Sequence, residues 1–281
     1  MFAELVELFS YPFVQRMLFA GLLASVVGGV IGTYVVVNRV VVMSGGIAHI
    51  SFGGIGLAYL LQDKLGWRWM DPILGAIIFA LLSGAVFSSD YIQKRVRRDS
   101  TVGVLWVIGM AAGIFFLNFV DKSRVTVQDP SSILFGNILL IKPFHLYLFA
   151  VLAAGILLLV AIFFRDFQML TFDEEFTTIS GLPTSALNLL LFSLIALTVV
   201  ILIKVVGVIL VIATLTVPPA IASFFNNRLS STMLWATLIG LTTTFLGVSS
   251  SLLFDTPPGP TIVLWMGAMF IPAFAIAKRF N

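Results

Sequence analysis

The 281-residue chain is 59% hydrophobic and only 10% charged, whereas an ordinary soluble domain is about 25% charged. This composition excludes a soluble enzyme, and the absence of cysteine excludes disulfides and thiol catalysis. The formal net charge of +3 is ordinary for a membrane protein with basic cytoplasmic loops, so no nucleic acid partner is expected.

Long stretches without any Asp, Glu, Lys or Arg dominate the chain. There are nine of them, at 17–38, 40–62, 72–89, 100–120, 143–164, 176–203, 205–227, 229–254 and 256–277. A helix needs about 20 mainly apolar residues to cross the hydrocarbon core, whereas transmembrane β-strands read as short alternating segments. We therefore predict an all-α polytopic membrane protein with nine spans, or eight if one is re-entrant. The spans would form a single transmembrane domain over residues 1–281.

Two of these runs carry stripes of small residues at helical spacing, where positions three and four apart share a face. In run 17–38 the stripe consists of Gly21, Ser25, Gly28 and Gly32. In run 40–62 it consists of Gly45, His49, Gly53 and Gly56. Small residues let membrane helices approach closely, and close packing is our interpretation of the first stripe.

The second stripe differs because it holds a histidine, and an ionisable group deep in a span is a functional candidate by default. Either His49 bonds to a neighbouring helix in a close-packed pair, or the glycines leave a narrow pathway in which His49 touches the cargo. A single imidazole is a poor resident metal site, because zinc usually takes three or four protein ligands. A metal contact at His49 would therefore be transient. His145, the other histidine, lies near the predicted outer surface and is the weaker candidate.

Positive charge sets the predicted orientation, because basic residues favour the cytoplasmic side of a membrane. The strongest basic cluster consists of Lys94, Arg95, Arg97 and Arg98. We therefore place the connection 91–99 in the cytoplasm. Alternation then puts 63–71 and 121–142 outside and 165–185 inside.

Three local signals refine the boundaries of the runs. Asp99 directly precedes the fourth run and is predicted to be the N-cap of its helix. Residues 130–141 are apolar but too short to cross, which indicates a short re-entrant or surface segment on the outer side. Residues 204–207 form either a tight outer turn or a kink inside the membrane, and the later Pro218 and Pro219 lack the backbone donor that a helix uses.

The longest cytoplasmic connection is predicted at 165–185. Asp173 is placed to cap a short helix, whose positive N-terminal end favours the carboxylates that follow. Gly181 and Pro183 would end this helix. A short amphipathic helix on the cytoplasmic face suits docking onto a soluble partner, and the alternative is an ordinary solvated connector.

Several catalytic signatures are missing from the sequence. It contains no GxxxxGK[ST] phosphate-binding loop, no HExxH and no GxSxG. Every Asp and Glu falls between the runs or at their edges, whereas proton- or sodium-coupled transporters usually keep carboxylates inside the membrane. The residues therefore describe a conduit without its own energy source. A stand-alone secondary transporter, a membrane scaffold and an intramembrane enzyme are poorer fits.

Six segments form a specific set through their order and spacing. They are 46–51 (GIAHIS), 99–103 (DSTVG), 134–137 (LFGN), 173–181 (beginning DEEF), 204–220 (from KVVG to PPA) and 254–260 (FDTPPGP). With these segments the chain resembles the permease subunit of ATP-binding-cassette importers for divalent transition metals, the zinc/manganese/iron permease family. The matching segments are spread along nearly the whole chain.

The resemblance implies an importer-type permease fold similar to that of the vitamin B12 and iron-siderophore permeases, in a bacterial or archaeal inner membrane. It implies three partners: a second permease copy in a homodimer, cytoplasmic ATP-binding subunits, and an external metal-binding solute-binding protein. ATP would bind to the partner subunits, and the divalent metal would be the transported substrate rather than a cofactor. The coupling contact with the ATPase would involve Asp173, Glu174, Glu175, Phe176 and Gly181. The substrate pathway would include Gly45, His49, Gly53 and Asn137.

Two positions depart from the family pattern. Many members carry an aspartate four residues before the histidine, where this chain has Gly45, and an aspartate after the outer Phe-Gly, where it has Asn137. Both changes remove a hard anionic ligand, which manganese favours more than zinc does. We therefore expect zinc as the cargo with manganese or iron as alternatives, while a metal chelate would suit the same architecture.

Overall fold

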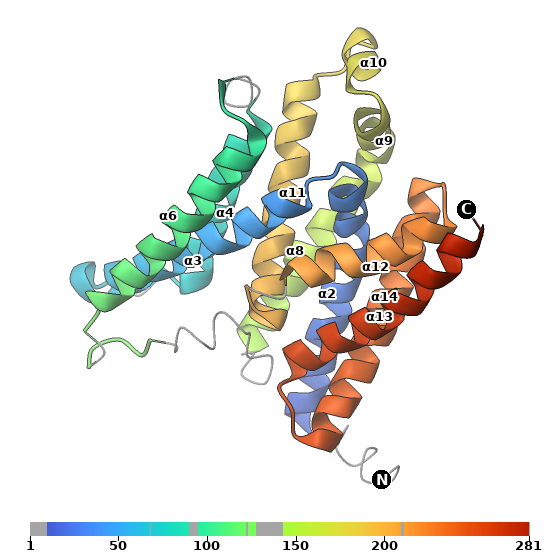
Figure 1. The fold of residues 1–281 in the computed structure, drawn as a ribbon. Coiled ribbons are helices and arrows are strands. Elements are labelled where there is room, and N and C mark those ends of the chain that lie inside the picture. The colour runs from blue at the N-terminus through green and yellow to red at the C-terminus, as the bar shows by residue number, and fades with distance from the viewer. Residues whose placement is uncertain are drawn as a thin grey trace. The chain divides into compact units, whose positions relative to one another are not determined.

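The computed structural model describes residues 10–67, 69–89, 95–121, 123–127, 143–208 and 211–280. Within these ranges all the regular structure is helical (Figure 1). The helices are α2 (Pro12–Val37), α3 (Val41–Leu65), α4 (Pro72–Ser88), α6 (Arg98–Asn118), α8 (Pro143–Ile162), α9 (Phe164–Phe172), α10 (Glu174–Ile179), α11 (Thr184–Val206), α12 (Val211–Phe225), α13 (Leu229–Phe254) and α14 (Pro258–Phe280).

Each of the nine charge-free runs contains an apolar helix, so the all-α polytopic prediction is confirmed. Seven helices in the described ranges are long and apolar enough to cross a membrane. The other two, α4 with 17 residues and α12 with 15 residues, are shorter. At 1.5 Å per residue, α12 extends about 22 Å, less than the hydrocarbon thickness of about 30 Å. Helix α12 is therefore the candidate for the single re-entrant segment of the alternative, because the 17 residues of α4 reach the lower limit of a spanning helix. The predicted segment 130–141 lies outside the described residues.

One predicted helix boundary is wrong. Asp99 is not an N-cap, because α6 begins at Arg98 and Arg97 occupies the cap position. Asp99 lies instead in the first turn, where the positive end of the helix still favours a carboxylate. The run 176–203 divides as the predicted connection 165–185 requires. Its first residues belong to α10, and the spanning helix begins only at Thr184.

The segment 204–207 ends a helix rather than kinking one. Helix α11 stops at Val206, and Gly207 follows with φ +86°, a left-handed conformation that only glycine adopts without strain. Its N–H donates to the Ile203 carbonyl at 2.9 Å, and α12 then begins at Val211. The structure thus favours the tight turn over the kink.

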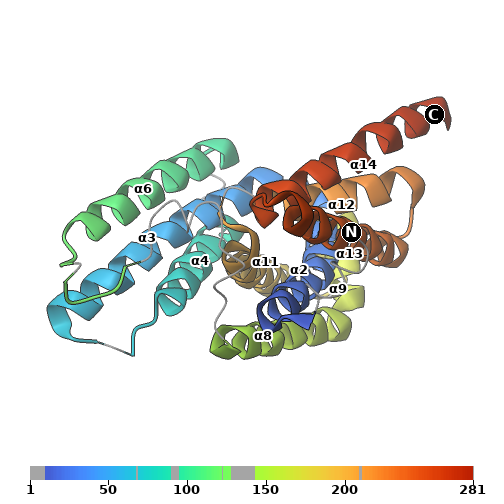
Figure 2. The ribbon, with the colours of Figure 1, turned by 90° about the horizontal axis from the view of Figure 1, so that it is seen from below.

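The chain forms two compact units, and each is described separately. The first comprises Met1–Val41, Leu134–Ile162 and Ile201–Asn281. The second comprises Val42–Ile133 and Phe163–Val200. In the first unit α2 packs against α8, α12 and α13 (Figure 2). In the second, α3 packs against α4 and α6 through glycines.

The small-residue stripe of α2 packs against two helices, as predicted. Ser25 Oγ and Thr244 Oγ1 of α13 form a hydrogen bond of 2.9 Å. At Gly32, a Cβ would lie 2.5 Å from the Leu215 carbonyl oxygen and 2.9 Å from Pro219 Cγ in α12. Pro219 has no N–H to donate to the Leu215 carbonyl four residues earlier. Glycine therefore lets α2 lie directly against the turn of α12 in which proline removes a backbone hydrogen bond.

Candidate functional site

Helices α3 and α6 form a tightly packed parallel pair within the second unit (Figures 1 and 2). A Cβ on Gly53 would lie 2.9 Å from the Gly109 carbonyl oxygen, and one on Gly56 would lie 2.6 Å from the Gly113 carbonyl oxygen. Because both partners advance together along the sequence, the two helices run in the same direction. This agrees with the predicted topology, in which both cross from the cytoplasm outward.

His49 lies inside this pair and is only 6% exposed. Its imidazole stacks on the indole of Trp106 in α6, with ring centroids 4.1 Å apart and planes inclined by 21°. Nδ1 is buried and has no hydrogen-bond partner among the described residues. The histidine is therefore held by an aromatic face rather than by a polar group at Nδ1.

The predicted stripe is thus a packing face, at least for three of its members. Gly53, His49 and Gly56 all contact α6, as expected for small-residue packing between membrane helices. Gly45 is buried, and Asn137 lies outside the described residues. The role of these residues in a substrate pathway stays a prediction.

The described ranges contain no group of three or more His, Cys, Asp or Glu side chains placed to hold a metal ion together. The geometry around His49 therefore offers one imidazole and an aromatic neighbour. Such a site is able to make a passing contact with a metal ion, whereas a resident zinc site takes three or four ligands.

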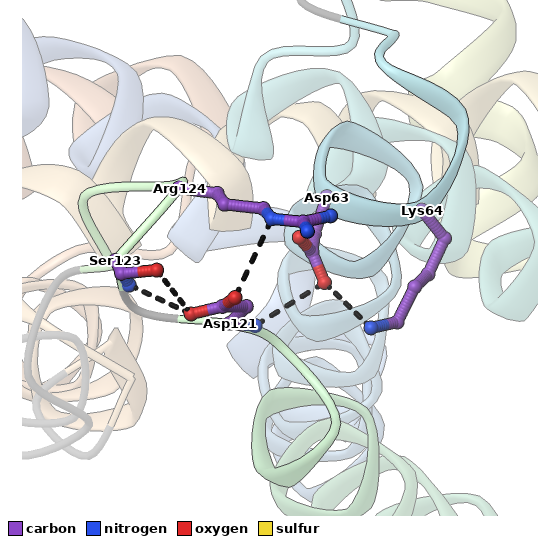
Figure 3. Close-up of polar contacts among 5 residues, drawn as sticks. All are labelled: Asp63, Lys64, Asp121, Ser123 and Arg124. Atoms are coloured by element: carbon purple, nitrogen blue, oxygen red, sulfur yellow. Dashed lines mark hydrogen bonds and ion pairs between the residues drawn. The ribbon is translucent and has the colours of Figure 1, made fainter.

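A polar cluster joins the ends of α3 and α6 at the side that the topology places outside (Figure 3). Asp63 Oδ2 accepts a hydrogen bond from the Asp121 N–H at 3.2 Å and lies 2.8 Å from Lys64 Nζ. Asp121 Oδ1 accepts from Ser123 N and Oγ at 3.0 and 2.6 Å. Its Oδ2 lies 3.4 Å from Arg124 Nε. The cluster fixes the connection after α6 onto the end of α3.

Sequence reasoning missed this cluster, although its charged residues flank two predicted spans. The missing information was the parallel pairing of α3 and α6, which brings Asp63 and Asp121 together. Hydrogen bonds from Ser123, and then the positive charge of Arg124, hold the pKa of Asp121 below its ordinary value. The carboxylate is therefore ionised throughout the neutral range.

The connection 165–185 contains the short helix that the sequence predicts. Asp173 is its N-cap, and its Oδ1 accepts from the Phe176 N–H at 2.8 Å. Gly181 follows the helix with φ +83°. One side-chain hydrogen bond joins α10 to α11, in which Asn188 Nδ2 donates to Glu174 Oε1 at 2.8 Å. Within α10 the buried Thr177 hydroxyl donates to the Asp173 carbonyl at 2.7 Å.

The outer face of α10 is apolar and unusually exposed. Phe176 is 55% exposed and Ile179 is 80% exposed, and Phe172 at the end of α9 is 62% exposed. These side chains lie on two short helices within the predicted cytoplasmic connection 165–185. An exposed apolar patch in such a place is typical of a protein interaction surface.

The chain is similar to known membrane transport proteins along nearly its whole length. The profile of the ABC 3 transport family matches residues 10–277. A Chlamydia pneumoniae protein named "Probable metal transport system membrane protein" is 36% identical, over 93% of this chain and 88% of that protein. The manganese transport system membrane protein MntC of Halalkalibacterium halodurans is 29% identical, over 97% and 90%. The solved structure of PsaBC from Streptococcus pneumoniae in complex with Fab has a chain with a TM-score of 0.85 and 29% identity, over 98% of this chain and 95% of that one.

Proposed function

The chain belongs to the ABC 3 transport family, and from this we propose that it is the permease through which an ATP-driven importer moves zinc across the membrane. The chain is a multi-pass membrane transport subunit of the metal ABC transporter type, and the ATPase of such a system lies in a partner. The match over residues 10–277 is the observation that carries this conclusion.

The choice of zinc follows from two positions. Gly45 and Asn137 replace carboxylates that the family pattern leads us to expect, and manganese depends on hard oxygen ligands more than zinc does. Imidazole, which His49 supplies, is a preferred zinc ligand.

Manganese is the second candidate, because MntC proteins of Halalkalibacterium halodurans and Listeria innocua are named for manganese transport. Their identities to this chain are 29% and 28%.

We propose that His49 contacts the metal in transit. The imidazole is the one ionisable group of its stripe, and its buried Nδ1 has no hydrogen-bond partner among the described residues. A metal arriving there would replace no hydrogen bond at that atom. Gly53 and Gly56 bring α6 close enough to keep the contact narrow.

We also propose that α10 is the coupling contact with the ATPase. Its capped N-terminus and its anchored Glu174 hold the helix in place, while Phe176 offers an exposed apolar side chain to a partner. Glu175 adds a charge beside it, and Gly181 allows the sharp exit from the helix. This arrangement suits transmission of a rigid-body movement from a soluble subunit.

The remaining partners are proposed on the same basis. A solute-binding protein would deliver the metal from outside, and a second permease copy would complete the pathway. Only one stripe of helix α8 is buried within the chain, and it consists of Phe149, Ala153, Ile156 and Val160. The opposite face remains available to lipid or to the second copy.

The test is uptake by the permease reconstituted in liposomes with its ATPase and delivery protein. We expect zinc to stimulate ATP hydrolysis and uptake more than manganese does. His49→Ala should reduce uptake at limiting zinc by about tenfold, which corresponds to one lost interaction of about 1.4 kcal/mol. His145→Ala, at matched abundance, is the control and should transport normally. Stronger stimulation by manganese would overturn the zinc assignment, and normal uptake by His49→Ala would remove His49 from the pathway.

A further inference from the structure

Trp106 has no role in the function described so far, yet its indole covers the imidazole of His49. The ring centroids lie 4.1 Å apart and the rings are nearly parallel. His49 is only 6% exposed. Trp106 is itself half-buried. A metal ion binds imidazole through a nitrogen lone pair in the plane of the ring, and Nδ1 of His49 is buried in this packing. The stacked indole holds the ring in that orientation.

Flanking contacts hold the stack in place. About one turn before it, a Cβ on Gly46 would lie 3.1 Å from Val102 Cγ1 of α6. About one turn after it, a Cβ on Gly53 would lie 2.9 Å from the Gly109 carbonyl oxygen. The separation of the two helices is therefore set on both sides of the ring pair. Freeing the imidazole requires either a rotation of the indole or a local separation of α3 from α6.

We propose that Trp106 is a positioning residue for His49, which holds the imidazole against α6 and makes it available to the metal only when this stack opens. The inference rests on the proposed role of His49 in metal transit. In this role Trp106 controls how often His49 is able to bind the metal ion.

The direction of the effect follows from population arithmetic. When only a fraction of the molecules is competent, the apparent dissociation constant exceeds the intrinsic one by the inverse of that fraction. An aromatic pair of this geometry changes such an equilibrium by roughly two- to tenfold. Removing the indole should therefore lower the zinc concentration for half-maximal uptake by about two- to tenfold.

Four variants separate positioning from simple packing. Trp106→Ala removes the ring, and Trp106→Leu keeps much of the apolar volume without an aromatic face. Trp106→Phe retains a stacking face and should behave like the wild type. Val107→Ala, at a position of α6 that is 67% exposed, is the matched control on the same helix.

A chemical readout tests the inference without transport. Diethyl pyrocarbonate acylates accessible imidazole nitrogen, and the chain has only two histidines. Peptide mass spectrometry therefore reports on His49, with His145 as the internal reference. In the purified full-length permease, Trp106→Ala and Trp106→Leu should label faster at His49 alone, while Trp106→Phe and Val107→Ala should label like the wild type.

The uptake assay then uses zinc and the double variant His49→Ala/Trp106→Ala. We expect the double variant to match His49→Ala, because Trp106 acts through the imidazole. Unchanged His49 labelling in both Trp106→Ala and Trp106→Leu would overturn the inference, as would faster labelling of both histidines or a Trp106 effect that persists without His49. If His49→Ala transports normally while the labelling result holds, the proposed metal contact fails and the positioning of His49 by Trp106 stands.

Discussion

Replacing Gly109 with alanine should separate α3 from α6. A Cβ at this position would overlap the backbone of Ile50 and lie 3.0 Å from the His49 carbonyl oxygen. Ordinary contacts of a Cβ fall between 3.4 and 4 Å, so the helices would have to move apart. Gly103 on the same helix has open space instead, with nothing within 4 Å of its Cβ position.

The two alanine substitutions should therefore have opposite effects. Inserting a methyl group into a tightly packed contact costs about 1–3 kcal/mol. Replacing an unconstrained helical glycine by alanine gains roughly 0.5–1 kcal/mol. Gly109→Ala shares this gain, so the expected difference in the free energy of unfolding between Gly109→Ala and Gly103→Ala is the packing cost of about 1–3 kcal/mol.

Thermal unfolding in detergent measures this difference. Since 1 kcal/mol shifts the midpoint of a domain of this size by roughly 2–4 °C, Gly109→Ala should melt between about 2 and 12 °C below Gly103→Ala. Both variants add the same methyl group to α6, so detergent and helix propensity affect them alike. Equal midpoints would refute the close approach of the two helices.

Three further outcomes test other parts of the structure. Asp173→Ala should cost about 0.5–2 kcal/mol of local stability; amide exchange in 174–179 should rise and zinc-stimulated ATP hydrolysis should fall, whereas unchanged exchange would contradict the cap. Because the pKa of Asp121 is lowered, its carboxylate stabilises the folded protein fully above the ordinary carboxyl pKa, and this stabilisation is lost as pH falls through the lowered value. Asp121→Asn should therefore flatten the acid dependence of the melting midpoint below about pH 4. An unaltered acid profile would contradict the ionic contact of Asp121. Gly32→Ala should cost about 1–3 kcal/mol, whereas Gly267→Ala, in open space, should not lower the midpoint.

Local features of the candidate site were predictable where they depend on neighbouring residues. The Asp173 cap and the exit at Gly181 follow from the capping preferences of Asp and Gly within a short segment. Asp99 shows the limit of the same logic, since the helix starts one residue earlier and the side chain moves from cap to first turn. One residue of uncertainty at a helix end is enough to change the role of a carboxylate.

The surroundings of His49 were not predictable in this way. Its stripe of glycines is compatible with close packing and with a pathway, and the sequence does not say which helix packs against it. Trp106 lies far along the chain from His49, and Asp121 is similarly distant from Asp63. No local pattern connects such residues, because the contacts depend on which faces of α3 and α6 meet.

The sequence alone determines that this chain is a multi-helical membrane protein, because the length of an uncharged apolar run is matched against the thickness of the bilayer. It also determines the motifs that place the chain in its transport family. The tertiary structure decides that α3 and α6 are parallel partners, that an indole covers the imidazole, and that two distant aspartates share one polar cluster. These depend on close packing between helices, where the shape of both surfaces at once selects the register.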